Sequence, residues 1–134
     1  MTPEEIEATI KEFHDVRRLN DRDSIMAYFT DDAEFSISGQ ESANSIACTA
    51  NGCEAMTPIV EQLVSLWSWD DVEFRDIAVN GPTAFVHYTL TTTHQGNRTT
   101  MVTDVVDKIT FADGKITKMV QFIDTAYAGE VAQR

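Results

Sequence analysis

The residue with the clearest capacity for chemistry is Asp107, a single acid in a stretch that otherwise turns apolar side chains to one face. Side chains alternate from Thr99 to Phe111 as in a β-strand, and one face would carry Met101, Thr103, Val105, Asp107, Ile109 and Phe111. An acid among apolar neighbours must find a partner, ionise at a cost or stay protonated. Asp107 is therefore the leading candidate for acid–base catalysis.

His87 is the second catalytic candidate, because a neighbouring carboxylate orients an imidazole ring and favours its protonated form. Whether the two side chains meet depends on the turn around Gln95-Gly96-Asn97. A three-residue turn aligns Phe85 with Asp107 and places His87 diagonally beside the acid on the same face. A two-residue turn directs His87 outward instead, and then the pair does not form.

The next turn, Ala112-Asp113-Gly114-Lys115, decides which residue faces Asp107 from the following strand. A three-residue loop with a bulged glycine places Gln121 opposite Asp107, whereas a two-residue turn brings Val120 opposite. Gln121 cannot act as an acid or base, but it can orient a ligand or form a hydrogen bond with Asp107.

Composition and spacing argue against several classes of partner. The 134-residue chain has a net charge of -12, which repels nucleic acid and anionic lipid, so neither nucleic acid nor a membrane is an expected partner. The first residues lack the basic and apolar parts of a signal peptide, which favours a cytoplasmic protein. Cys48 and Cys53 fit neither zinc nor redox spacing, and we expect no metal and no cofactor.

The predicted elements follow an α+β order. Thr2-Pro3-Glu4-Glu5 is typical of a helix start, and an apolar stripe continues it to about Leu19. A short helix ends at Tyr28, a loop covers Ser38 to Asn51, and a third helix covers about Cys53 to Ser68. Strands are predicted at 33–37, 71–79, 83–94, 99–111 and 115–124. This order predicts antiparallel neighbours with the helices gathered on one face of a curved sheet.

A curved sheet under helices leaves a hollow that suits a hydrophobic small molecule. Tyr28 should lie near its mouth, where its hydroxyl could bind a carbonyl oxygen, and Gln121 should reach it from the last strand. His14, near the polar edge of the first helix, and His94, at a turn, are expected to be ordinary surface residues. The remaining side chains expected at the hollow are Phe13, Phe35, Ile37, Ile109 and Met119.

Three phrases give the chain a family likeness: Tyr28-Phe29-Thr30-Asp31-Asp32-Ala33, Phe111-Ala112-Asp113-Gly114-Lys115-Ile116 and Gln121-Phe122-Ile123-Asp124. With the capped first helix, they make the chain resemble the nuclear transport factor 2-like superfamily, and within it the SnoaL-like polyketide cyclase and ketosteroid isomerase group. The resemblance implies one domain over residues 1–134, usually dimeric. It implies a cone-shaped α+β fold of the cystatin-like barrel type, in which three helices from the N-terminal half wrap a curved antiparallel or mixed sheet.

The resemblance carries over only part of a catalytic set. Asp107 falls where ketosteroid isomerases keep an acid protonated in an apolar site, from which it donates a hydrogen bond to a developing oxyanion. The general base of those enzymes would stand at Ile37 and their oxyanion tyrosine at Asp15, so steroid isomerisation by that mechanism is not expected. Gln121 likewise replaces the acid that limonene epoxide hydrolase carries on its last strand.

Two functions stay open, because members of this group include isomerases, cyclases, dehydratases and proteins without catalysis. The first is a cofactor-free isomerase, cyclase or dehydratase that uses Asp107 and His87 for proton transfer on a hydrophobic, oxygenated substrate. The second is a non-catalytic ligand-binding or dimerisation module of the same fold. In either case a homodimer through the outer sheet face is expected, formed by the run Thr89 to Thr93 with Val86, Tyr88 and Leu90.

Overall fold

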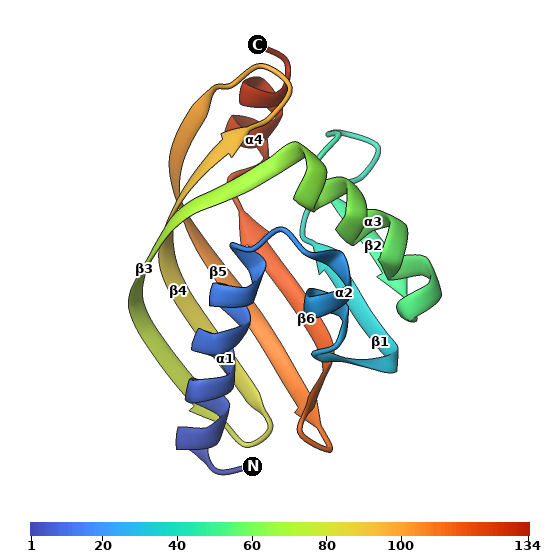
Figure 1. The fold of residues 1–134 in the computed structure, drawn as a ribbon, viewed down its shortest axis with the longest axis vertical. Helices are drawn as coiled ribbons and strands as arrows, with labels where there is room; N and C mark the ends of the chain where they lie inside the picture. Colours follow the sequence, from blue (N-terminus) through green and yellow to red (C-terminus); the bar gives the residue numbers. More distant parts are fainter.

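A strongly curved, six-stranded sheet forms the frame of the protein in a computed structural model that describes all 134 residues (Figure 1). The strand order is β2-β1-β6-β5-β4-β3, and every neighbouring pair is antiparallel except β1 with β6, which are parallel. The predicted α+β cone with a mixed sheet is confirmed, although the sheet stays open and does not close into a barrel. The strands are β1 Phe29–Ile37, β2 Cys48–Asn51, β3 Trp67–Asn80, β4 Thr83–His94, β5 Thr100–Ala112 and β6 Lys115–Ile123.

Three of the four helices lie over one face of this sheet: α1 (Pro3–Arg17), α2 (Arg22–Met26) and α3 (Cys53–Leu66). The fourth, α4 (Thr125–Ala132), packs near the hairpin that joins β4 to β5, at the end of the molecule opposite the N-terminus (Figure 1). None of the helices combines the length and the apolar content needed to span a membrane.

The start of α1 confirms the predicted cap. The hydroxyl of Thr2 accepts a hydrogen bond from the backbone N–H of Glu5 at 3.1 Å. Pro3 occupies the first turn, where its lack of a backbone N–H costs the helix no hydrogen bond. The helix ends at Arg17, two residues before the expected end. Its buried face carries Ile6, Ile10, Phe13, His14 and Arg17.

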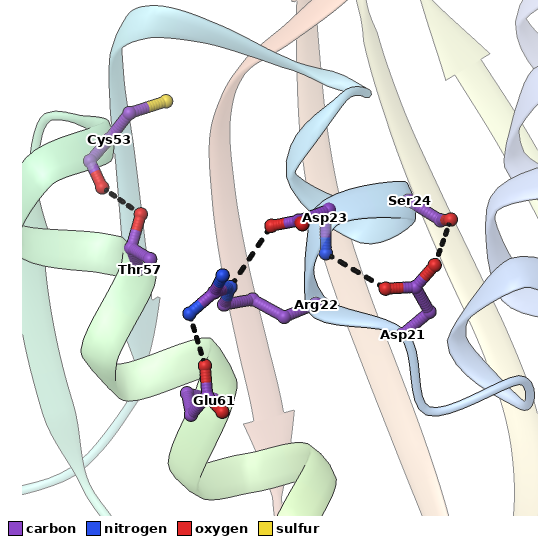
Figure 2. A network of polar contacts seen from close by, with 7 residues as sticks. All are labelled: Asp21, Arg22, Asp23, Ser24, Cys53, Thr57 and Glu61. Atoms are coloured by element: carbon purple, nitrogen blue, oxygen red, sulfur yellow. Dashed lines mark hydrogen bonds and ion pairs between the residues drawn. The ribbon is translucent and has the colours of Figure 1, made fainter.

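Helix α2 is held by its own cap and by an ion pair to α3 (Figure 2). Asp21 accepts hydrogen bonds from the backbone N–H of Asp23 at 3.2 Å and from the hydroxyl of Ser24 at 2.6 Å. Arg22 lies between Asp23, at 3.1 Å, and Glu61 of α3. Solvent screens such exposed pairs, so they orient α2 more than they stabilise it.

Two elements lie where the sequence predicted none. Strand β2 falls within the expected loop from Ser38 to Asn51 and pairs antiparallel with β1, so that Phe35 faces Ala50. Helix α4 begins after Asp124, whose carboxylate accepts a hydrogen bond from the N–H of Tyr127 at 3.0 Å.

The connection between β4 and β5 is longer than either length considered from the sequence. His94 donates its N–H to the carbonyl of Thr99 at 2.9 Å, which leaves the four residues 95–98 as the loop. A four-residue loop, like a two-residue turn, is even in length and brings the same set of alternate β4 residues onto the face of Asp107. Val86 therefore pairs with Asp107. The predicted pairing of Phe85 with Asp107 is wrong, and His87 lies on the opposite face from the acid.

The even length of this loop also makes the expected outer face wrong. Val86, Tyr88 and Leu90 are all buried on the inner face. The side chains that β4 turns outward are those at the alternate positions, including Phe85 and His87. The large apolar side chains exposed on the strands are Phe85, Val102 and Phe122.

The β5–β6 hairpin reaches the expected pairing by a different route. Asp113 and Gly114 form a two-residue turn with φ angles of +53° and +79° between the paired residues Ala112 and Lys115. A register shift next to the turn, between Thr110 and Phe111, then moves the pairing by one residue. The strands beyond it have the same partners that a bulged three-residue loop would have given. Asp107 therefore faces Gln121, which is one of the two alternatives that the sequence left open.

Candidate functional site

Asp107 lies at the centre of a buried polar network. Its side chain is fully buried, and one oxygen, Oδ2, contacts both His14 Nε2 at 3.1 Å and the hydroxyl of Tyr88 at 2.8 Å. The other oxygen, Oδ1, is buried and has no hydrogen-bond partner. Helix α1 and strands β4 and β5 thus each supply one member of the network.

His14 is the partner of Asp107 on α1, and its predicted surface position is wrong. It was expected at the surface, yet its side chain is 1% exposed. The signal was its spacing: His14 stands four residues after Ile10, within the arc of α1 that faces the sheet. Asp15, where the resemblance to ketosteroid isomerases put the helix residue of the site, is exposed, and the buried residue is its neighbour His14.

The hydrogen-bond geometry fixes the number of protons in the His14–Asp107 pair. His14 Nδ1 lies 2.8 Å from the carbonyl oxygen of Ile10, which can only accept, so Nδ1 carries a hydrogen. The contact between Nε2 and Oδ2 then needs one further proton, on either the ring or the carboxyl group. The pair is therefore either imidazole with carboxylic acid or imidazolium with carboxylate.

Aromatic rings enclose the pair and keep water away from it. The ring of His14 lies 4.7 Å from that of Tyr88, 5.4 Å from Phe74, 5.7 Å from Phe13 and 5.8 Å from Trp69. Burial, followed by the negative charge of Asp107, raises the pKa of Tyr88 well above its usual value. Tyr88 is therefore a neutral donor to Asp107 at physiological pH.

A cavity of about 90 Å³ lies between the helices and the sheet beside this network. Fifteen of its 18 lining residues are hydrophobic, and the other three are Arg17, Thr92 and Gln121. Gln121 joins the cavity to the network, because its amide Nε2 donates to the hydroxyl of Tyr88 at 3.4 Å. Asp107, His14 and Tyr88 do not themselves line the cavity.

Most of the residues expected at the hollow do line this cavity. The structure places Tyr28 and Ile109 elsewhere: Tyr28 is half-buried against the ring of Phe13 at 5.4 Å, and Ile109 is fully buried in the core. The expected residues that line the cavity are Phe13, Phe35, Ile37, Met119 and Gln121.

The other two histidines also differ from their predicted environments. His87 is half-exposed on the outer face, 3.8 Å from Asp104. The proposed contact with Asp107 is wrong because the loop between β4 and β5 has an even number of residues. His94, expected at the surface, is 8% exposed and packs edge-on against Trp67 at 4.8 Å.

Arg17 is the site residue that the sequence did not single out. Its position was visible, since it continues the apolar stripe of α1 four residues after Phe13. The guanidinium carbon lies 4.8 Å from the centre of the Trp69 ring. Burial lowers the pKa of Arg17 to about 10, so the side chain is a buried cation at neutral pH.

Known proteins share the fold of this chain. The model of the SnoaL-like domain family matches residues 10–119. A protein from Rhodopseudomonas palustris, described provisionally as an isomerase, is 14% identical with a TM-score of 0.81, over 99% of this chain and 98% of that one. An NTF2-like protein from Burkholderia xenovorans LB400 is 21% identical with a TM-score of 0.77, over 98% of both chains.

TerC, co-crystallised with polyporic acid, is 20% identical with a TM-score of 0.76, and the match covers 97% of this chain and 98% of TerC. No match was found among curated proteins. Identities this low establish a common fold and leave the reaction of this chain open.

Proposed function

This chain belongs to the family of SnoaL-like domains, and on that premise we propose that it binds a hydrophobic, oxygen-bearing small molecule and catalyses cofactor-free proton transfer on it. The observation that carries the proposal is the His14–Asp107 pair, which holds one proton between two buried groups next to an apolar cavity. Groups that share a proton in a water-poor site are suited to general acid–base catalysis.

The proton acceptor in this proposal is Asp107 Oδ1. His14 and Tyr88 occupy Oδ2, whereas Oδ1 has free lone pairs. A carbon–hydrogen bond next to a substrate carbonyl breaks and its proton passes to Oδ1, while the C–H electron pair forms a C=C bond and the carbonyl π pair moves onto oxygen to give an enolate. In a β,γ-unsaturated ketone the enolate is conjugated with the second C=C bond, and return of the proton to the γ carbon completes an isomerisation.

Gln121 controls access to the acid and stabilises the enolate. It pairs with Asp107 across β5 and β6 and lines the cavity, so in this proposal its side chain turns aside to admit a substrate to Oδ1. Its amide N–H can then donate to the developing oxyanion, as such donors do in other enzymes. In this role Gln121 binds and positions the substrate, and Asp107 transfers the proton.

Hydrogen–deuterium exchange tests this function without knowledge of the natural substrate. Enolisable cyclic and aromatic ketones are first screened for binding by the fluorescence of Trp67 and Trp69, which both line the cavity. Bound ketones are then incubated in deuterated buffer, and exchange next to the carbonyl is followed by NMR. We expect exchange above the buffer rate, and a loss of at least about 100-fold in Asp107→Asn, the lower end for general-base catalysis.

His87→Gln is the matched control, because it removes a histidine from the outer face and should leave exchange unchanged. His14→Gln should slow exchange by removing the partner that holds the shared proton. If ketones bind and exchange no faster than in buffer, the catalytic part of the proposal is wrong.

That outcome would favour the second function, a non-catalytic ligand-binding module. The observation on its side is that His14, Asp107 and Tyr88 lie outside the cavity lining. In such a module the network only fixes α1 against the sheet. TerC, which has the same fold, was co-crystallised with a small molecule, and this supports ligand binding under either function.

The homodimer remains a prediction, with its interface moved to the observed outer face. Phe85 and Phe122 are 42% and 46% exposed there. We propose that a second copy covers them, and a dimer mass in sedimentation that falls to a monomer in Phe122→Glu would support this.

A further inference from the structure

Arg17 is the only charged residue in the cavity lining, and it has no acidic partner. The side chain is 8% exposed. The sequence holds 22 aspartates and glutamates, so acids are abundant, yet none of them forms an ion pair with this guanidinium. A buried charge without a counterion is costly and seldom occurs by chance.

The protein satisfies the guanidinium only in part. Its Nη2 donates to the backbone carbonyls of Leu63 at 3.3 Å and Trp67 at 3.0 Å, and Nη1 donates to the amide oxygen of Asn20 at 2.9 Å. A guanidinium has five N–H donors, so the Nε–H and one N–H of Nη1 are left for another acceptor. All three acceptors are neutral, and the ring of Trp69 is the other group against the guanidinium, so no acidic side chain balances the positive charge.

The rest of the lining defines the body of the ligand. Aliphatic and aromatic side chains make up 15 of the 18 lining residues, and Thr92 and Gln121 are the only other polar ones. We propose that the cavity takes a hydrophobic molecule with one anionic oxygen group of the carboxylate class, and that this group is bound by Arg17. The inference rests on the proposed ligand binding, but it does not require catalysis.

The overall charge of the protein makes the inference specific to this residue. With a net charge of -12, the molecule as a whole repels anions. Any preference of the cavity for an anion must therefore come from a local cation, and Arg17 is the one that lines it. A buried ion pair is also screened less by salt than an exposed one, so the preference should persist at high ionic strength.

The test compares three probes of equal chain length: decanoate, decanol and decylammonium. Each is titrated into the full-length protein near neutral pH, and binding is followed by the fluorescence of Trp67 and Trp69, the two tryptophans of the chain. We expect decanoate to bind at least about tenfold more tightly than decanol, and decylammonium to bind most weakly.

Three variants assign the preference to a residue. Arg17→Gln should bind decanoate and decanol about equally, whereas Arg17→Lys keeps a cation and should keep part of the preference. Arg18→Gln is the matched control, because Arg18 is exposed, lies outside the lining and changes the net charge by the same amount. It should bind all three probes as the wild type does.

Equal binding of decanoate and decanol by the wild-type protein would overturn the inference, and this comparison needs no variant to fold. A preference for decanoate that survives in Arg17→Gln would overturn the assignment to Arg17. If none of the probes binds, the proposed ligand-binding function fails together with the inference. Binding of decanol without any preference for decanoate refutes only the anionic class and leaves that function standing.

Discussion

Replacing Tyr88 by phenylalanine removes one oxygen atom from the buried network and leaves the ring packing in place. The lost hydrogen bond is the 2.8 Å contact from the Tyr88 hydroxyl to Asp107 Oδ2. Asp107 then keeps His14 as its single side-chain partner, because Oδ1 has none. A hydrogen bond to a charged group contributes about 1.5–3 kcal/mol, and one between neutral groups about 0.5–1.5 kcal/mol.

We expect Tyr88→Phe to lower the free energy of unfolding by about 2 kcal/mol, as for an imidazolium–carboxylate pair. At about 2.1 cal/mol/K per residue, a chain of 134 residues has an unfolding entropy of about 0.28 kcal/mol/K. The change therefore corresponds to a decrease of about 7 °C in Tm. Urea unfolding followed by circular dichroism gives the free energy, and a thermal scan gives the Tm.

Tyr127→Phe is the control for this prediction, because the Tyr127 hydroxyl makes no hydrogen bond and its loss should change stability by less than about 0.5 kcal/mol. The effect of Tyr88→Phe should shrink by at least about 1 kcal/mol in an Asp107→Leu background, where the acceptor is absent. A cost of less than about 0.5 kcal/mol, or the same cost with and without Asp107, would refute the reasoning.

Two further predictions concern pH and the last hairpin. The folded state raises the pKa of Tyr88 above 10.0, so its stabilising effect is complete below pH 10 and is lost as the pH rises through the folded pKa. Urea titrations between about pH 9 and about pH 11 should show a steeper loss of stability in the wild type than in Tyr88→Phe, and equal slopes would contradict this. Gly114→Ala should destabilise the protein by about 1–2 kcal/mol, because Gly114 has a φ of +79°, and an unchanged urea midpoint would show that the turn tolerates a side chain.

The position of Asp107 could be predicted because it depends on strand periodicity, which is local. An uninterrupted alternation around it placed the acid on the inner face, and the structure agrees. The facing residue, Gln121, was one of two alternatives and was expected only with a three-residue loop, which the structure does not have. A two-residue turn and a register shift compensate each other, and only the paired backbone of both strands reveals the shift.

The histidines could not be placed because their environments depend on one loop and on helix packing. Arg98, with a φ of +61°, takes a left-handed conformation that is more typical of glycine or asparagine, so its residue type gave no sign of the four-residue loop. That error reversed the orientation of His87. His14 was misplaced because its polar side chain outweighed its position on the buried arc of α1.

The parallel pairing of β1 with β6 has a consequence for how the protein is made on the ribosome. One wall of the cavity joins Phe35 to Met119 and Ile37 to Gln121, from two segments far apart in the sequence. Until β6 has been synthesised, β1 has no partner on that side and its apolar residues stay accessible to other chains or to chaperones. The cavity thus cannot form before β6 has been synthesised, and a ligand that needs this cavity cannot assist folding until then.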